Sequence, residues 1–293
     1  MKLKEVLDKT TAFFKDKKLD TPRLDAELLL SHGLKMDRIQ LYMKFDQPLS
    51  DEELATCREL VRRRSQGEPV AYILGYKEFY SLRFEVNSHT LIPRPETEHI
   101  IEEALKWASN KDREFKILDL GTGTGCVGLT LLKQFPNAKL VSVDISDEAL
   151  KVAQRNAESL GVQDRVLFVH VDAGNTDVVL QNYQDFMGQS NIDILVSNPP
   201  YIANEDPLVE KDVRKFEPHT ALFAEDDGLA LLKVWSAQYS PKLSHPGLLL
   251  MEMGMSQGPK MSEHLVKLGM FNEVRVIKDL SGHDRVLRGV ING

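Results

Sequence analysis

A short apolar run that leads into a glycine-rich turn restricts the fold of this chain more than any other feature. Residues 116–120 (KILDL) have the pattern of a buried strand, residues 121–125 (GTGTG) that of a turn, and Leu129, Leu131 and Leu132 begin a helical pattern. A strand that passes through glycines into a helix is typical of a parallel α/β sheet, and amides at such a helix start bind anionic or polar ligands. The sequence therefore predicts an α/β protein with a nucleotide-type ligand at this turn.

Six further apolar runs continue the alternation of strands and helices. We expect strands at 139–143, 166–171, 192–196, 248–253, 274–277 and 286–290, and helices at 147–160, 228–239 and 260–268. This order predicts a doubly wound sheet, in which ligands bind at the carboxyl ends of the strands. Four residues at such ends are therefore expected to converge on one crevice: Gly121, Asp144, Asp172 and Asn198.

Two of these four residues are carboxylates. Asp144 lies 23 positions after Gly121, where it could accept hydrogen bonds from both hydroxyls of a ribose. The alternative is that Asp144 only favours the start of the helix that follows. Asp172 could accept from an adenine amino group or be an ordinary turn residue, and Ala173 beside it would only pack against the ligand.

The segment Asn198-Pro199-Pro200-Tyr201 directly follows an expected strand. A conjugated NH2 group becomes nucleophilic only when acceptors orient both of its hydrogens. Asn198 offers a side-chain carbonyl and Pro199 a backbone carbonyl on a stiff segment, while the Tyr201 ring could stack on a planar group. The segment predicts a site for a planar nitrogen; the alternative is that Pro199 and Pro200 only end the strand.

The N-terminal part has a different pattern. Apolar residues recur there at helical spacing, and Ser50 with Glu53 predicts a capping box. Residues 82–86 then alternate as in a strand, with 76–80 as a hairpin partner. We expect three parts, which are a helical domain at 1–70, a β-hairpin linker at 71–92 and a catalytic domain at 93–293.

The segment at 93–98 (PRPETE) precedes an expected helix at 98–108. Its prolines predict a fixed turn. Two roles are open for Arg94, which could close over the ligand or pair with Glu96 or Glu98 at the surface.

Composition restricts the class of protein. No run approaches the roughly 20 apolar residues of a membrane span, and the N-terminus carries charges of both signs, so we expect a soluble, cytoplasmic protein without a membrane partner. Cys57 and Cys126 are far apart, and the eight histidines have no ligand spacing. Neither a disulfide framework nor a metal site is therefore expected.

The charge distribution is unfavourable for nucleic-acid binding. Residues 1–86 carry 16 Lys and Arg against 15 Asp and Glu, whereas the remaining residues carry 21 against 29. An enzyme that binds a duplex needs basic side chains to neutralise phosphates. The basic triplet at 62–64 is expected to be the solvated end of a helix, so direct nucleic-acid binding is not expected.

Several motifs together resemble a known family. DLGTGTG at 119–125, VD at 143–144 and NPPY at 198–201 are similar to the class I methyltransferases that use S-adenosylmethionine. The flanking segments resemble more specifically the HemK/PrmC family, which methylates the glutamine of the GGQ tripeptide in peptide-chain release factors: PVAYILGYKEFY at 69–80, LIPRPETE at 91–98 and EPHTALFAEDDGL at 217–229. The similarity spans nearly the whole chain. Ala173 is a departure, because some members carry an aromatic residue there beside the adenine.

This resemblance implies a Rossmann-like domain, with a mixed seven-stranded sheet and helices on both faces, preceded by a small helical domain that docks the release factor. It implies that S-adenosylmethionine contacts Gly121, Thr122, Gly123, Thr124, Gly125, Asp144, Asp172, Ala173 and Asn198, and that S-adenosylhomocysteine is the product. It also implies that the glutamine amide of the GGQ loop contacts Asn198, Pro199, Pro200 and Tyr201. Of these, Asn198, Pro199 and Tyr201 would act in methyl transfer to the amide nitrogen N5.

Other functions remain as alternatives. An amino-nitrogen (adenine-N6 type) methyltransferase acting on nucleic acid would suit the same Asn-Pro-Pro-Tyr chemistry, although the acidic catalytic part disfavours it. A cofactor-sensing module without activity would have no need of Asn198. A dehydrogenase would want a third glycine at position 126, where this chain has Cys126. The sequence therefore favours a release-factor glutamine methyltransferase that modulates translation termination.

Overall fold

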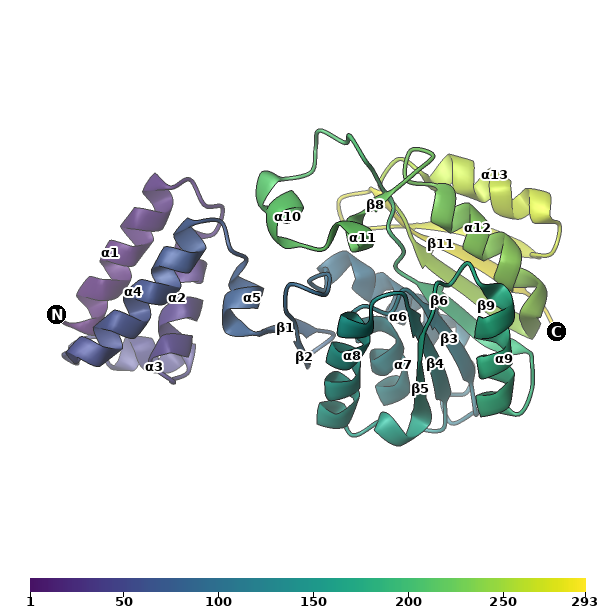
Figure 1. The fold of residues 1–293 in the computed structure, drawn as a ribbon, viewed down its shortest axis with the longest axis horizontal. Helices are drawn as coiled ribbons and strands as arrows, with labels where there is room; N and C mark the ends of the chain where they lie inside the picture. Colours follow the sequence, from purple (N-terminus) through teal and green to yellow (C-terminus); the bar gives the residue numbers. More distant parts are fainter. The chain divides into compact units, whose positions relative to one another are not determined.

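The computed structural model describes residues 1–293, which form two compact units (Figure 1). The first unit contains Met1–Tyr76 and Lys211–Phe216, and the second contains Lys77–Glu210 and Glu217–Gly293. The sequence did not predict that a short segment from the second half of the chain would join the N-terminal helices. The three domain ranges drawn from the sequence stay a prediction.

The first unit consists of helices around an apolar core of their own. They are α1 (Leu3–Asp16), α2 (Pro22–Gly33), α3 (Arg38–Met43), α4 (Asp51–Ser65), α5 (Val70–Leu74) and α10 (Lys211–Phe216). Helix α1 buries Leu3, Leu7 and Phe14, which share one face. The predicted capping box is present, since Ser50 Oγ accepts from the Glu53 amide (3.2 Å) and the Glu53 carboxylate accepts from the Ser50 amide (2.8 Å).

The predicted hairpin is also present. Strands β1 (Tyr76–Phe79) and β2 (Leu82–Glu85) pair as a two-stranded sheet. Tyr80 and Ser81 connect them with φ angles of +49° and +60°, the left-handed geometry of the tight turns that match strand twist.

The second unit contains a mixed seven-stranded sheet, as the resemblance implied. The strand order is β10-β11-β9-β6-β3-β4-β5. Strand β11 pairs antiparallel with both β10 and β9, and all other pairs are parallel. From β3 the chain continues to β4 and β5 and then returns to β6 on the other side of β3, so the strand order reverses there. The strands are β3 (Lys116–Leu120), β4 (Lys139–Asp144), β5 (Val166–His170), β6 (Ile192–Ser197), β9 (Leu243–Glu252), β10 (Glu273–Lys278) and β11 (Asp284–Ile291).

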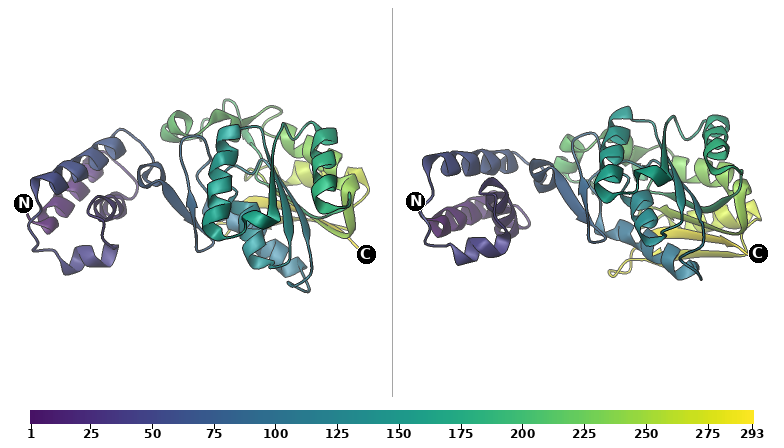
Figure 2. Two further views of the ribbon diagram at one scale, coloured as in Figure 1. Left: turned by 60° about the horizontal axis from the view of Figure 1, so that its bottom comes forward. Right: turned by 90° about the horizontal axis from the view of Figure 1, so that it is seen from below.

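Helices cover both faces of this sheet (Figure 2). One apolar core lies beneath α6 (Glu98–Trp107), α7 (Cys126–Gln134) and α8 (Asp147–Leu160). The other lies beneath α9 (Thr176–Met187), α12 (Ala230–Tyr239) and α13 (Gly258–Leu268). Because both faces are covered, the central strands are mostly apolar, with a few buried polar residues such as Asp119 of β3 and Asp193 of β6.

The strand register brings the strand ends level with one another. Leu120 of β3 pairs with Val143 of β4 and with Ser197 of β6, and Ser197 pairs in turn with Met251 of β9. The residues that follow these positions therefore lie side by side at the carboxyl ends of the strands. These residues are Gly121, Asp144, Asn198 and Glu252.

Some elements were not predicted from the sequence. Helix α9 was missed because its buried residues, Val179, Tyr183 and Met187, form a narrow stripe in a polar segment. Strand β9 begins at Leu243, earlier than the expected start at residue 248. The short elements were also not anticipated: α11 (His219–Leu222), β7 (Ile202–Ala203), β8 (Phe223–Ala224), and the 3-10 turns η1 (Pro95–Thr97), η2 (Gln163–Arg165) and η3 (Ser240–Lys242). No helix combines the length and apolarity needed to cross a lipid bilayer.

Candidate active site

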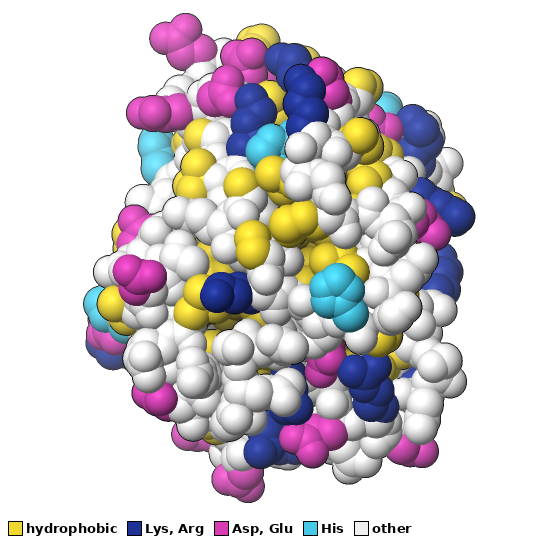
Figure 3. Space-filling view, turned by 90° about the vertical axis from the view of Figure 1, so that its right-hand side faces the viewer, with side chains coloured by type: hydrophobic (Ala, Val, Ile, Leu, Met, Phe, Trp, Pro, Cys, Tyr) yellow, Lys and Arg dark blue, Asp and Glu magenta, His cyan; other side chains and the backbone are white.

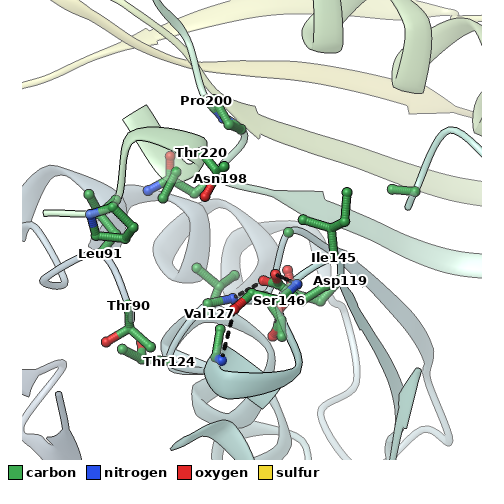
Figure 4. Close-up of a pocket in the computed structure, with 18 of the residues that line it drawn as sticks. Thr90, Leu91, Asp119, Thr124, Val127, Ile145, Ser146, Asn198, Pro200 and Thr220 are labelled. Carbon is green, nitrogen blue, oxygen red and sulfur yellow. Dashed lines mark hydrogen bonds between the residues drawn. The ribbon is translucent and has the colours of Figure 1, made fainter. Parts of the chain in front are cut away.

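The carboxyl ends of four neighbouring strands border one cavity of about 350 Å³. Gly121 follows β3, Asp144 ends β4, Asp172 follows β5 and Asn198 follows β6, and all four line this cavity. Figure 4 shows Asn198 on one side of the cavity, separate from Ser146 at the start of α8. The structure thus brings together the four residues that the strand pattern selected.

The glycine turn has a backbone that favours glycine. The φ angle is +70° at Gly121, +55° at Gly123 and +80° at Gly125, a region that side chains rarely allow. A Cβ added at Gly125 would lie 2.7 Å from Cδ1 of Leu129, whereas one added at Gly123 would meet nothing within 4 Å. Gly125 therefore allows α7 to pack on the turn and does not line the cavity, while Gly121 and Gly123 do.

Asp144 connects the glycine turn to the start of α8. Its Oδ2 accepts from the Gly123 amide (2.8 Å) and its Oδ1 accepts from the Ser146 amide (2.9 Å). Burial raises the pKa of Asp144, and these amides partly offset the effect. Each carboxylate oxygen can accept more than one hydrogen bond, so this geometry allows both roles considered for Asp144.

Asp172 has the turn geometry that was one of its two alternatives. Its Oδ1 accepts from the Gly174 amide (2.7 Å), and its backbone carbonyl accepts from the Asn175 amide (2.8 Å). Asp172 nevertheless lines the cavity together with Ala173. The Ala173 carbonyl accepts from the buried Tyr239 hydroxyl at 2.5 Å. This hydrogen bond holds the backbone of the cavity wall at Ala173 in place.

Asn198 presents an unsatisfied acceptor at the cavity. Its Nδ2 donates to Oγ1 of Thr97 (3.3 Å), whereas its Oδ1 is buried and has no hydrogen-bond partner. A buried acceptor without a donor costs about 1–3 kcal/mol. A ligand with an N–H group could recover this free energy.

The other residues of the Asn-Pro-Pro-Tyr segment have different surroundings. Pro200 lines the cavity, but Pro199 and Tyr201 do not. The Tyr201 hydroxyl donates to Oε1 of Glu252 (2.8 Å), and the Tyr201 carbonyl accepts from Nε2 of Gln257 (2.8 Å). Burial raises the pKa of Tyr201 well above its usual value, so the hydroxyl stays protonated. In this structure Tyr201 anchors the segment rather than presenting its ring to the cavity.

Arg94 takes neither of the partners considered from the sequence. Its guanidinium pairs with the buried carboxylate of Glu217, which also accepts from the Ile92 amide (3.1 Å). This ion pair joins two segments that are far apart in the chain. Both segments wall the cavity, through Leu91, Pro93, Pro218, Thr220 and Phe223.

A buried carboxyl group that the sequence analysis did not select also lines the cavity. Asp119 is 2% exposed, and its Oδ2 accepts from the Thr122 hydroxyl (2.7 Å). Burial raises the pKa of Asp119 to about 7. The sequence could have indicated this residue, because Asp119 is the one acidic residue in the apolar KILDL strand, next to the glycine turn.

The rest of the wall is largely apolar and comes from segments that sequence reasoning did not connect. It includes Val127, Ile145, Ala149, Leu231 and Trp235. These side chains are ordinary core residues by pattern, so only the fold reveals that they face a cavity. A cavity with an apolar wall and a few polar groups is typical of small-molecule sites.

The chain is similar to curated proteins over nearly its full length. It is 37% identical to the release factor glutamine methyltransferase of Rhodopirellula baltica, over 96% of this chain and 94% of that one. It is 39% identical to the protein of the same name from Geobacter sulfurreducens, over 99% and 96% of the two chains. The chain belongs to the release factor glutamine methyltransferase family.

Family models agree with this assignment of the chain to the release factor glutamine methyltransferases. The PrmC N-terminal domain model matches residues 5–75, which cover helices α1 to α5, and the Methyltransferase small domain model matches residues 102–217. Among solved structures, the catalytic domain of hMettl16 in complex with MAT2A 3'UTR hairpin 1 has a TM-score of 0.53, at 16% identity over 83% of each chain. At this identity the likeness concerns the fold alone.

Proposed function

We propose that this protein transfers a methyl group from S-adenosylmethionine to the side-chain amide nitrogen N5 of the glutamine in the GGQ motif of peptide-chain release factors, and thereby modulates translation termination. The full-length relatives that carry this activity in their name support the proposal. The observation in the site that carries it is the unsatisfied Oδ1 of Asn198, because a primary amide offers the N–H donor that this oxygen lacks.

The residues around the glycine turn fit S-adenosylmethionine, which when bound supplies a methyl group on a positively charged sulfur. The open space at Gly123 and the carboxylate of Asp144 suit the close approach of a ribose to the turn. We assign the methionine and ribose parts to Gly121, Thr122, Gly123, Thr124 and Asp144, with Asn198 nearby. Gly125, which does not line the cavity, would contribute only by letting α7 pack on the turn. We assign the adenine to Asp172 and Ala173. Ala173 is small, whereas some members of the family carry an aromatic residue at this position.

The Asn-Pro-Pro-Tyr segment would orient the substrate amide. In this proposal Asn198 Oδ1 accepts one amide hydrogen and the Pro199 carbonyl accepts the other, so that the nitrogen directs its electron density toward the methyl group. The nitrogen would form one new bond to the methyl carbon while the bond between that carbon and sulfur breaks, and the electron pair would stay on sulfur, so that S-adenosylhomocysteine leaves. The nitrogen would then lose one proton to solvent. Orientation of the reacting groups is the main contribution of the protein, and Pro200 and Tyr201 would keep the segment in place.

The alternative, methylation of nucleic acid, has less support. The arginines at 62–64 are engaged with carboxylates, since Arg62 pairs with Glu59, Arg63 with Glu68 and Arg64 with Asp25. On the face of the molecule drawn in Figure 3, acidic and basic side chains are interspersed and form no continuous basic stripe. A phosphate backbone would need such a stripe. Because release factors act in translation, the proposal includes a cytoplasmic location.

The variant Asn198→Ala tests the role of the amide. We expect transfer of labelled methyl to a release factor to fall by about 100-fold, because orientation of the nucleophile is lost, while S-adenosylhomocysteine still binds in calorimetry. Asn182→Ala, at a half-buried position of α9 where the side chain donates to the Val178 carbonyl, is the matched control and should behave like the wild type. Retained transfer in Asn198→Ala, or loss of cofactor binding as the cause of its inactivity, would contradict this role.

A further inference from the structure

Trp235 is a large aromatic side chain in the cavity wall with no role in the chemistry described so far. It lies on α12, is 6% exposed and lines the cavity together with the glycine turn. A Cβ added at Gly121 would lie 3.5 Å from Cη2 and 3.6 Å from Cζ3 of the Trp235 indole. The six-membered ring of Trp235 therefore reaches the turn at the carboxyl end of β3.

The indole nitrogen of Trp235 does not anchor the side chain. Its Nε1 is buried and has no hydrogen-bond partner, although a buried tryptophan usually finds an acceptor for this N–H group. An unpaired buried donor lowers stability, and an apolar side chain without an N–H group would fill a core without this loss. Core packing alone therefore does not account for an indole at this position, and the ring surface at the cavity becomes its distinguishing property.

Helix α12 also holds the part of the wall that we assign to the adenine. Tyr239 lies four residues after Trp235, on the same face of the helix, and its hydroxyl donates to the Ala173 carbonyl. Ala173 and Trp235 belong to one buried apolar core, and both line the cavity. Because the side chain of Ala173 is a single methyl group, it offers a planar ligand little surface.

Phe223 also lines the cavity but belongs to a different part of the wall. It pairs with Ile202 of β7, directly after the Asn-Pro-Pro-Tyr segment, and its ring contacts that of His219 (5.3 Å between centroids). Phe223 therefore lies on the side of the cavity that we assign to the substrate. Trp235, which shares a core with Ala173, is the better placed aromatic side chain for the adenine.

We infer that Trp235 contacts the adenine ring of the cofactor, and so provides from α12 the aromatic surface that some members of the family carry at position 173. Stacking of a base on an aromatic side chain raises affinity by about tenfold or more, and it needs no hydrogen bond from the indole. The inference rests on the proposed function, since it requires an adenine in this cavity. It makes Trp235 a binding residue with no part in methyl transfer.

The fluorescence of Trp235 can report this contact, because the chain contains two tryptophans. The other, Trp107, ends α6 and packs beside Phe115 (5.9 Å between ring centroids) in the core on the opposite face of the sheet. In Trp107→Phe the emission comes from Trp235 alone. We expect S-adenosylhomocysteine to lower this emission by about twofold or more through stacking, with a midpoint equal to the Kd from calorimetry. In Trp235→Phe the emission of Trp107 should stay constant.

Moving the aromatic ring tests the same contact through affinity. Trp235→Leu keeps an apolar side chain and removes the ring, so we expect the Kd for S-adenosylhomocysteine to rise by about tenfold. Ala173→Phe in that background supplies a ring at position 173 and should bring the Kd to within about threefold of the wild type. Trp107→Leu removes an indole outside the cavity and is the matched control, with a Kd within about twofold of the wild type.

Three results would overturn the inference. They are constant Trp235 emission while calorimetry shows full binding, a Kd in Trp235→Leu within about twofold of the wild type, and no gain in affinity when Ala173→Phe is added to Trp235→Leu. If Trp235→Leu does not fold, the fluorescence titration still decides, because Trp107→Phe keeps Trp235 itself. A wild-type protein that binds S-adenosylhomocysteine but does not methylate release factors would instead overturn the proposed function and leave the contact with Trp235 standing.

Discussion

Asp144 is the residue whose removal should most directly weaken the cofactor site. Its carboxylate oxygens accept from the Gly123 and Ser146 amides, so it orders the turn, and we propose that it also receives the ribose hydroxyls. Hydrogen bonds to a charged group contribute about 1.5–3 kcal/mol each. We therefore expect Asp144→Ala to raise the Kd for S-adenosylhomocysteine by at least about tenfold in calorimetry. Asp147→Ala, at an exposed position on α8, is the control, and equal affinities of the two variants would argue against the ribose role.

Asp119 should make the stability of the protein depend on pH. Its folded pKa of about 7 lies above the ordinary value of 3.8, so the stability it contributes is present below about pH 4 and is lost as pH rises to about 7. Asp119→Asn does not titrate. We therefore expect the free energy of unfolding, measured in urea, to fall for the wild type relative to this variant as pH rises from 5 to 8. If the difference in the free energy of unfolding between Asp119→Asn and the wild type is the same at pH 5 and at pH 8, the raised pKa is refuted.

At the level of single residues, the sequence could indicate the polar groups at strand ends but not how they are coupled. Asp144 and Asn198 could be selected because each directly follows an apolar run. Thr97 and Glu252 could not, since their patterns are those of a helix start and a strand end. Thr97 meets Asn198 across 101 positions of the chain and Tyr201 meets Glu252 across 51, so only the folded chain brings these pairs together.

At the scale of elements, the turn before α12 supports the Asn-Pro-Pro-Tyr segment. Gly228 has a φ angle of +81°, and a Cβ added there would lie 2.0 Å from the carbonyl oxygen of Tyr201. Gly228→Ala should displace that backbone and lower kcat for methyl transfer by at least about tenfold, because a small misplacement of reacting groups is costly.

Gly161 provides the matched control for this variant. It ends α8 with a φ angle of +67°, and an added Cβ would meet nothing within 4 Å. Gly161→Ala carries a similar backbone strain, about 1 kcal/mol of stability, and should leave kcat unchanged. If both variants transfer methyl groups equally well, Gly228 has no role in holding the segment.

The success of element prediction followed the strength of the apolar pattern. Most strands between the two helix layers were predicted closely, because continuous apolar runs bounded by turns are distinctive. The more polar first part of β9 was missed. Helix α9 was missed because one buried residue in four gives a weak signal among polar neighbours. The paired segments β7 and β8 were missed because two residues in each strand carry no periodicity.

For the whole molecule, binding of the cofactor product should stabilise the sheet that forms the site. A ligand at 100 times its Kd adds about 2.7 kcal/mol to the free energy of unfolding. We therefore expect S-adenosylhomocysteine to raise the thermal unfolding midpoint and to slow amide hydrogen exchange in β3 and β4. NAD serves as the control. Protection by NAD but not by S-adenosylhomocysteine would support the dehydrogenase alternative.

The most direct test of the central claim is to locate the methyl group. Purified release factor, a copy with the GGQ glutamine replaced by alanine, and nucleic acid would each be incubated with the protein and S-adenosylmethionine, and the products digested and examined by mass spectrometry. We predict one added methyl on the GGQ glutamine of the unaltered factor and none on the other two. A methyl group on nucleic acid, or on another residue of the release factor, would contradict the proposed function.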